Sequence, residues 1–175
     1  FEREIISERT RDKMAAARRK GKYVGGAPIL GYDIDREASR LIVNETEASR
    51  VKQIFELYLQ HESLLATIAE LDNRGWTTKQ WTTKKGKPKG GVQFNKNNLH
   101  GLLTNVAYIG KVRYKEEIHE GQHDAIIVPE VFDRVQRLLQ RNHRTGGKRV
   151  RNKSGALLKG LLHCTPCDCA MTHSH

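Results

Sequence analysis

The chain has 175 residues, of which 37% are hydrophobic and 29% charged, a composition typical of an ordinary folded domain with surplus polar surface. Its formal net charge is +11 at pH 7, which disfavours cationic binding partners and favours polyanions. No apolar run approaches the roughly 18 residues that a membrane span needs, and no secretory leader is recognisable, so the sequence predicts a cytoplasmic protein without a membrane partner.

The first predicted element is a polar helix over residues 1–20. This segment contains no glycine or proline and is followed by Gly21, a residue that commonly ends helices. Because its apolar residues are few, it cannot bury a wide face by itself, and we expect it to bridge two modules or to lie along a charged partner. Residues 21–31 are rich in glycine and predict an extended connector.

Two short strands are predicted next, at residues 32–34 and 41–43, around a polar turn. Asn44 is the predicted N-cap of the following helix, with Glu47 three residues later as in a capping box. Apolar side chains at helical spacing between residues 51 and 59 predict that this helix is amphipathic.

A second amphipathic helix is predicted at residues 63–74, and a third begins near Asn95 after a basic, glycine-rich loop. Beyond them, residues 108–114 and 125–128 alternate like strands. The acidic residues between those strands predict a solvated loop; they are Glu116, Glu117, Glu120 and Asp124. Pro129 then suits the first turn of a final helix, since its fixed φ matches a helix start.

Basic residues gather in two stretches that contain no Asp or Glu, residues 73–115 and 141–167. Uncompensated positive charge of this kind repels itself unless a polyanion lies beside it. Nucleic acid is therefore the first candidate partner and an anionic membrane surface the second. A solvated surface without a partner is the alternative interpretation of either stretch.

The segment from residue 63 to residue 110 carries the strongest functional pattern. A short apolar helix that ends at Gly75 and a second short helix after the basic loop resemble an expanded helix-turn-helix. On the second helix, the side chains of Lys96, Asn97 and His100 would be exposed while three leucines pack inward. Asn and Lys suit the edges of purine bases in the major groove. An ordinary three-helix core with a basic loop is the alternative.

The other predicted DNA-binding residues are all basic. Lysines of the loop would hold the protein in register through phosphates, and the end of the first helix would either complement the helix dipole or reach phosphates. These residues are Arg18, Arg19, Lys20, Lys22, Lys79, Lys84, Lys85, Lys87 and Lys89.

Cys164 and Cys167 have the spacing of half a zinc ribbon or zinc knuckle, because two thiolates two residues apart can bind one tetrahedral ion. Completion of a site within this chain would need Cys169, His163, His173 or His175. A redox pair and free thiols are the alternatives. We expect no cofactor within these 175 residues and zinc in an intact parent protein. No set of residues has a catalytic pattern, so no catalytic residue is predicted.

The order of these motifs is similar to that of the large serine recombinases, the phage integrases and transposon recombinases that cut and rejoin DNA through a phosphoserine linkage. Four stretches carry the resemblance: Arg-Arg-Lys-Gly at 18–21, Gly-Ala-Pro at 26–28 with Gly-Tyr at 31–32, Ile-Ala at 68–69 with Leu71 and Gly75, and Leu-Thr-Asn at 103–105 with Tyr-Ile-Gly at 108–110. The last resembles the family's Asn-x-x-Tyr-x-Gly. Pro129 with Phe132, then residues 157–171 with Cys-x-x-Cys, follow in the expected order.

The resemblance implies an α+β fold: a mainly helical, helix-turn-helix-like domain with small β elements, preceded by a long polar helix. Residues 1–20 would end the helix that leaves a catalytic domain, and 21–142 would form the recombinase DNA-binding domain. Residues 143–156 would be a linker, and 157–175 the start of a zinc ribbon. The nucleophilic serine would belong to an upstream catalytic domain, so no residue here inherits that role.

The implied partner is double-stranded DNA at attachment-type sites, where the intact, homo-oligomeric and bacterial or phage-encoded protein would integrate or excise DNA. This piece would be monomeric. Two other functions stay open. One is a non-catalytic helix-turn-helix regulator, and the other is an RNA-binding module, which the aromatics Trp76, Trp81, Tyr108 and Tyr114 among basic residues would suit.

Overall fold

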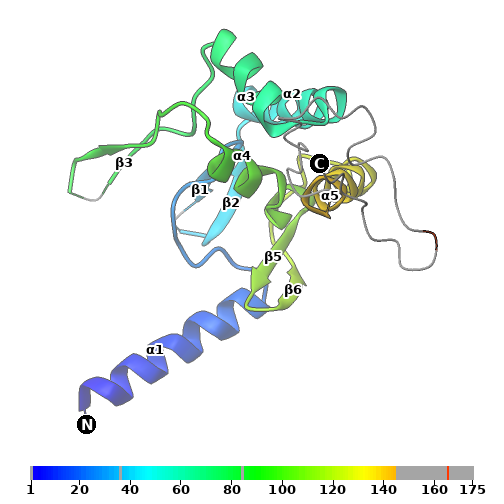
Figure 1. The fold of residues 1–175 in the computed structure, drawn as a ribbon. Helices are drawn as coiled ribbons and strands as arrows, with labels where there is room; N and C mark the ends of the chain where they lie inside the picture. Colours follow the sequence, from blue (N-terminus) through cyan, green and yellow to red (C-terminus); the bar gives the residue numbers. More distant parts are fainter. Residues whose placement is uncertain (1, 36, 84, 145–164, 166–175) are drawn as a thin grey trace, which may run out of the picture. The chain divides into compact units, whose positions relative to one another are not determined.

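The computed structural model describes residues 2–35, 37–83, 85–144 and 165. The chain divides into two compact units, Phe1–Leu138 and Leu139–His175, and the packing described below is that of the first. In chain order the elements are α1 Glu2–Arg19, β1 Tyr32–Asp35, β2 Arg40–Val43, α2 Glu45–His61, α3 Leu64–Asn73, β3 Trp81–Thr82, β4 Pro88–Lys89, α4 Lys96–Leu103, the 3-10 helix η1 Val106–Ile109, β5 Lys111–Tyr114, β6 Glu117–Glu120 and α5 Pro129–Arg144 (Figure 1). The predicted α+β class is confirmed.

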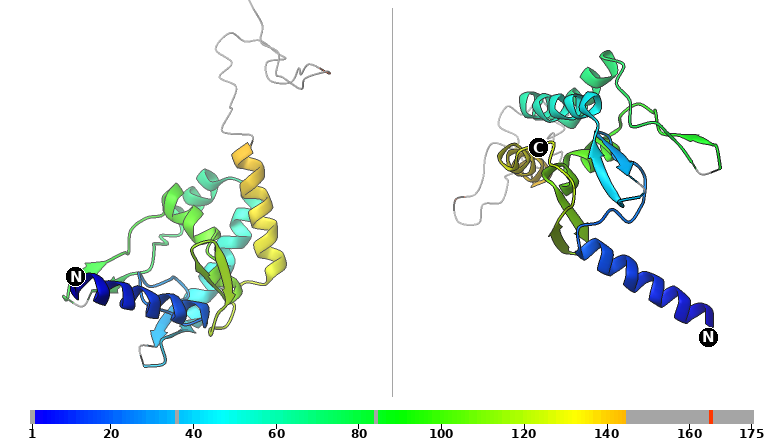
Figure 2. Two further views of the ribbon diagram at one scale, coloured as in Figure 1. Left: turned by 90° about the horizontal axis from the view of Figure 1, so that it is seen from below. Right: turned by 180° about the vertical axis from the view of Figure 1, so that it is seen from behind.

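The polar helix α1 ends as predicted, and the turn after it is built on Gly21. None of the described residues of α1 is buried. Gly21 has a φ of +73°, and a Cβ atom there would clash with the carbonyl oxygen of Glu120, so no larger residue fits without a shift. Gln122 fixes the turn, because its backbone N–H donates to Gly21 at 3.0 Å and its side chain to Lys20 at 2.8 Å. Figure 2, right, shows α1 meeting the β5–β6 hairpin at this end.

The first hairpin and the start of α2 also follow the prediction. β1 pairs with β2 in an antiparallel register that sets Tyr32 opposite Val43. The Asn44 side chain caps α2 by accepting a hydrogen bond from the backbone N–H of Glu47. The Glu47 carboxylate does not complete a capping box, because it instead accepts from the N–H of Gly31 at 2.9 Å. This contact joins the end of the connector to α2.

The core of the first unit is aromatic. The rings of Tyr32 and Tyr108 stack with centroids 6.1 Å apart, and Phe55 meets Tyr108 edge-on at 5.8 Å. All three side chains are at most 1% exposed. The Tyr108 hydroxyl donates to the carbonyl oxygen of Leu30 at 3.0 Å, and burial raises the pKa of both tyrosines, so their hydroxyls stay protonated. The connector, β1, α2 and η1 therefore share one core.

The prediction of a strand over residues 108–114 is wrong for its first part. Residues 106–109 form η1, which Asn105 caps by accepting from the N–H of Ala107 at 3.1 Å. Gly110, with a φ of +73°, ends it. β5 thus begins only at Lys111. Tyr108, which was predicted to be a strand residue, belongs to the core. Its ring contacts Tyr32 and Phe55, and its hydroxyl donates to Leu30.

The predicted partner strand is also wrong. β5 pairs with β6, which lies in the acidic segment predicted to be a solvated loop, and Lys111 stands opposite Glu120 in the register. Residues 125–128 form no strand. Instead the N–H groups of Ile126 and Ile127 both donate to the carbonyl oxygen of Tyr108 at 2.9 Å. That bend buries both isoleucines.

The glycine-rich segment between α3 and α4 forms an antiparallel hairpin rather than a loop. β3 pairs with β4, with Trp81 opposite Lys89, and a separate bridge joins Thr77 to Gln93. We call residues 77–93 the basic hairpin. Figure 1 and the right-hand view of Figure 2 show it projecting beyond α3 and α4. The one short strand pair and the bridge make it a separate arm of the first unit.

The three later helices begin near the residues predicted for them. Ser63 caps α3, and α4 begins with a capping box between Asn95 and Asn98. Pro129 occupies the first position of α5, as predicted. The amide of Gln136 on α5 donates to the carbonyl oxygen of Leu103 at 2.7 Å, which holds the end of α4. Among the described residues, no helix combines the length and the apolar character of a membrane span.

Candidate nucleic-acid interface

Helix α4 separates its side chains into a buried and an exposed face. Leu99, Leu102 and Leu103 are buried in the core. Lys96, Asn97 and His100 are exposed on the other face. α4 packs against α3, so its position is set by the fold while its polar face is open. An exposed helix face with amide, ammonium and imidazole groups can donate and accept hydrogen bonds at base edges.

The basic hairpin presents three of the predicted lysines. Lys85, Lys87 and Lys89 are exposed, and within the described part of the chain none of them forms an ion pair. Lys84 lies outside the described residues. These ammonium groups are free to meet phosphate oxygens, and their exposed stems let each one adapt its position.

Lys79, also predicted to bind DNA, has a different environment. Its side chain is 10% exposed, and its ammonium group lies 2.6 Å from Glu47 and 2.9 Å from Asp33. Burial alone would lower the pKa of Lys79, but the hydrogen bonds to the two carboxylates raise it above its ordinary value. The same bond lowers the pKa of Asp33. Lys79 therefore joins the base of the basic hairpin to β1 and α2, and the structure does not bring it together with the exposed lysines.

The basic residues at the end of α1 also differ in their surroundings: among the described residues, the side chains of the two arginines have partners and those of the two lysines have none. The guanidinium of Arg18 lies 5.8 Å from the centre of the Tyr114 ring, and Arg19 forms an ion pair with Glu117 at 3.4 Å. Lys20 and Lys22 are exposed. The two arginines thus bind α1 to the β5–β6 hairpin, whereas the two lysines face solvent.

The connector is fixed at both ends and open in its middle. Near its start, the N–H of Tyr23 donates to the carbonyl oxygen of Ser39 at 2.8 Å. Burial raises the pKa of the Tyr23 hydroxyl, which donates to Ala27 at 3.3 Å. Between these points Gly25 and Gly26 are exposed, with φ values of +93° and +134°. A connector without side chains at its middle allows close approach by another molecule's backbone.

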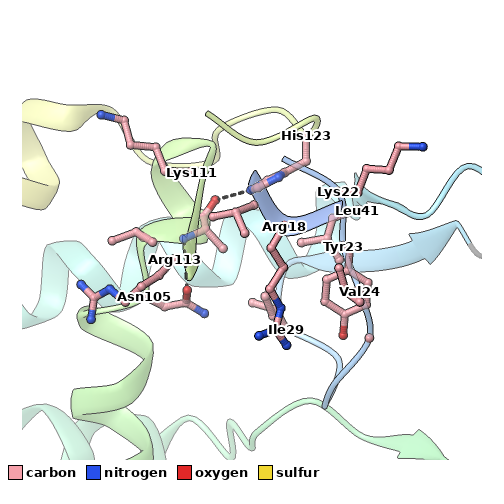
Figure 3. Close-up of a pocket in the computed structure, with 14 residues that line it drawn as sticks. Arg18, Lys22, Tyr23, Val24, Ile29, Leu41, Asn105, Lys111, Arg113 and His123 are labelled. Atoms are coloured by element: carbon pink, nitrogen blue, oxygen red, sulfur yellow. Dashed lines mark hydrogen bonds between the residues drawn. The ribbon is translucent and has the colours of Figure 1, made fainter. Parts of the chain in front are cut away.

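Sequence reasoning missed Arg113 as a site residue. Arg113 lines a pocket of about 280 Å³ together with Arg18, Lys22 and Asn105, and Figure 3 shows its guanidinium group directed away from that of Arg18. The pocket lies where the end of α1, the connector, η1 and β5 meet. The acid-free stretch at 73–115 was the available signal, but only the fold shows which of its basic residues lies beside α1.

The aromatic residues that suggested RNA binding do not form a shared stacking surface. Tyr108 is buried in the core and is unavailable to a base. Cations from Arg18, Arg19 and Lys115 lie over the ring of Tyr114. Arg74 covers Trp76 at 5.3 Å. Single-stranded nucleic acid is usually held on exposed aromatic rings. Among the described residues, Trp81, which is half-buried in β3, is the one of these four with no cation or aromatic ring over its own.

Cys164 and Cys167 lie outside the described residues, as do the predicted linker at 143–156 beyond residue 144 and the ribbon start at 157–175, apart from Thr165. Within the described residues, no three His, Cys, Asp or Glu side chains gather as metal ligands. The zinc expectation is therefore untested and stays a prediction.

Comparisons with known proteins agree on one family. The family model described as Recombinase matches residues 45–142. A protein of Bacillus subtilis (strain 168) named "Putative DNA recombinase" is 24% identical over 202 residues, covering 98% of this chain and 38% of that protein. The chain thus spans well under half of that relative's length.

Two solved structures have a similar fold. One is described as "Crystal Structure of a LSR-DNA Complex"; its TM-score is 0.69 at 24% identity, over 93% of this chain and 48% of that one. The other is described as "Sequence Requirements of the Listeria innocua prophage attP site", with a TM-score of 0.66 at 24% identity, over 89% of this chain and 61% of that one. The resemblance to the large serine recombinases that the motif order predicted is confirmed.

Proposed function

The chain belongs to the recombinase family, and from this premise we propose that residues 21–142 bind double-stranded DNA at attachment-type sites as part of a large serine recombinase. The observation that carries the proposal is α4, whose leucine face is buried while Lys96, Asn97 and His100 are exposed. The nucleophilic serine would lie in a catalytic domain outside these residues, and the intact, oligomeric protein would integrate or excise DNA.

Each part of the surface has a distinct role in this proposal. α3 and α4 act as a helix-turn-helix in which α4 enters the major groove and reads base edges. The exposed glycines of the connector follow the adjacent minor groove. Lys20 and Lys22 at the start of the connector, with Lys85, Lys87 and Lys89 of the basic hairpin, neutralise backbone phosphates and set the register.

Selection from a randomised duplex library, at near-physiological salt and again at higher salt, tests the proposal directly. We expect a reproducible motif that persists at the higher salt, because base-edge contacts do not depend on counterion release. Binding without a motif, lost steeply as salt rises, would leave phosphate contacts only and contradict base reading by α4.

Two sets of substitutions assign the roles. Replacing Lys96, Asn97 and His100 with alanine should reduce discrimination between the selected motif and a random duplex, by about 1–3 kcal/mol for each lost base contact. Replacing Lys85 and Lys87 with alanine, the matched control, should weaken both duplexes alike. Equal losses on both duplexes for both sets would show that α4 does not read sequence.

A zinc site at Cys164 and Cys167 in the intact protein is a separate proposal, supported by their spacing and by the family resemblance. Metal analysis of the intact protein tests it. One equivalent of zinc that is lost when both cysteines become serine supports the site, whereas zinc-free protein that retains native DNA binding contradicts it.

A further inference from the structure

One carboxylate oxygen joins two of the surfaces that the proposed function assigns to DNA. The Oε2 atom of Glu47 accepts a hydrogen bond from the backbone N–H of Gly31, at the end of the connector, at 2.9 Å. The same atom accepts from the ammonium group of Lys79, at the base of the basic hairpin, at 2.6 Å. Because one atom holds both bonds, any shift of the hairpin relative to the connector must stretch or break one of them.

The second partner of Lys79 fixes the direction of its side chain. The ammonium group also donates to Oδ1 of Asp33 on β1 at 2.9 Å, and the other oxygen of that carboxylate accepts from Asn44, the cap of α2, at 2.8 Å. We call Glu47, Lys79 and Asp33 the clip. Two carboxylates around one ammonium group leave the clip net negative, so Lys79 is unsuited to bind a phosphate itself.

On the hairpin side, the backbone beside Lys79 is closely packed. A Cβ atom at Gly90 would clash with the carbonyl oxygen of Lys79 and lie 2.7 Å from the ring of Trp81. The backbone N–H of Thr78 also donates to Val92 at 2.9 Å, so the hairpin moves with Lys79. Beyond the clip, a groove of about 580 Å³ lies between the connector, the hairpin and α4. Where this groove separates the hairpin from the connector, the bonds of the clip set their spacing.

We propose that the clip makes the protein sensitive to spacing within its DNA site, because it fixes the distance and angle between the hairpin and the connector. The inference rests on the proposed function, in which the connector follows the minor groove and the hairpin lysines bind phosphates. One inserted base pair would move the hairpin's phosphates by about 3.4 Å along the duplex and turn them by about a tenth of a helical turn. A hairpin held by the clip cannot follow them, whereas a released hairpin can. Lys79 and Glu47 are thus positioning residues that set specificity.

Insertion of a base pair tests this sensitivity. Hydroxyl-radical footprinting of wild type and of K85Q/K87Q first locates the part of the selected duplex that the hairpin covers, and one base pair is then inserted between that part and the rest of the site. The affinity of the intact protein is measured on the original and the inserted duplex. Wild type should bind the inserted duplex roughly tenfold more weakly, because the hairpin contacts can no longer form together with the others. In K79Q this ratio should fall to roughly threefold or less, because the freed hairpin reaches the displaced phosphates.

Three further variants separate positioning from other roles. K79R can bond to both carboxylates and should retain the wild-type ratio. E47Q keeps the pair between Lys79 and Asp33, so it should lower the ratio less than K79Q does. It also carries the test alone if thermal unfolding shows that K79Q is not folded. K87Q, the matched control, should weaken binding to both duplexes alike and leave the ratio unchanged.

The failure of this inference is distinct from the failure of the proposed function. A wild-type ratio retained in both K79Q and E47Q, or equal binding of the two duplexes by wild type, would overturn the clip and leave DNA binding intact. Weaker binding of K79Q to both duplexes alike, as in K87Q, would make Lys79 a phosphate contact instead. If wild type binds no duplex, the proposed function fails and the clip with it.

Discussion

The aromatic core and the basic hairpin are held in position by different forces. In the core, the rings of Tyr32, Phe55 and Tyr108 are almost fully buried and touch one another. In the hairpin, the paired strands are two residues long, Val92 is 58% exposed, and Lys79 supplies ion pairs to the rest of the unit. The core should therefore respond to lost volume, and the hairpin to lost charge.

The largest expected effect is on the core. Phe55→Ala removes a ring that contacts both Tyr108 and Phe132, and we expect it to lower the free energy of unfolding by about 3–5 kcal/mol. Urea unfolding followed by circular dichroism measures the loss. Val92→Ala on the hairpin, also an apolar truncation, should stay within about 0.5 kcal/mol of wild type. Similar losses in both variants would mean that the hairpin is packed like the core.

The next effect concerns the attachment of the hairpin. Lys79→Met removes the bonds to Asp33 and Glu47 and leaves two carboxylates near one another, which should cost about 1–2 kcal/mol. We also expect faster tryptic cleavage after Lys85 and Lys89, because the hairpin base is released. Lys87→Met, at an exposed lysine without an ion pair, is the control and should leave unfolding unchanged. Unaltered cleavage and stability in the Lys79 variant would show that the ion pairs do not hold the hairpin.

A smaller effect is expected where the core meets the connector. Tyr108→Phe keeps the ring and removes the hydroxyl that donates to Leu30, so it should cost about 1 kcal/mol. Tyr23→Phe removes a longer, exposed bond to Ala27 and should cost less than half of that. Thermal unfolding of the two variants compares them, and equal shifts would remove the distinction between the anchored end of the connector and its open middle.

The same contrast explains which features could be predicted from sequence. The cap at Asn44 and the helix starts near Ser63 and Asn95 could be predicted because each of these signals is local in the chain. The exposed face of α4 followed from its leucine spacing for the same reason. These local signals define the helices and the base-reading candidates, which are Lys96, Asn97 and His100.

The missed features depend on contacts between distant residues. Tyr108 has the spacing of a strand residue, but its hydroxyl partner, Leu30, precedes it by 78 residues. Lys79 resembles any other lysine of a basic stretch, although its carboxylate partners lie 46 and 32 residues earlier. β6 is charged and was read as a loop, because its pairing with β5 leaves it largely exposed. No local pattern contains these partners.

The finest test of the comparison is the effect of acid on the hairpin attachment. Asp33 has a lowered pKa in the folded protein, chiefly through its hydrogen bond from Lys79. Its contribution to stability is therefore complete above its unfolded pKa, near 4, and is lost as the pH falls through the lower folded value.

We expect the stability difference between wild type and Lys79→Met to be constant from pH 7 to about pH 5 and to shrink below pH 4. The difference between wild type and Phe55→Ala, which involves no titrating group, should persist through the same range. A Lys79 difference that persisted in acid would mean that the hydrocarbon stem of Lys79, and not its charge, holds the hairpin in place.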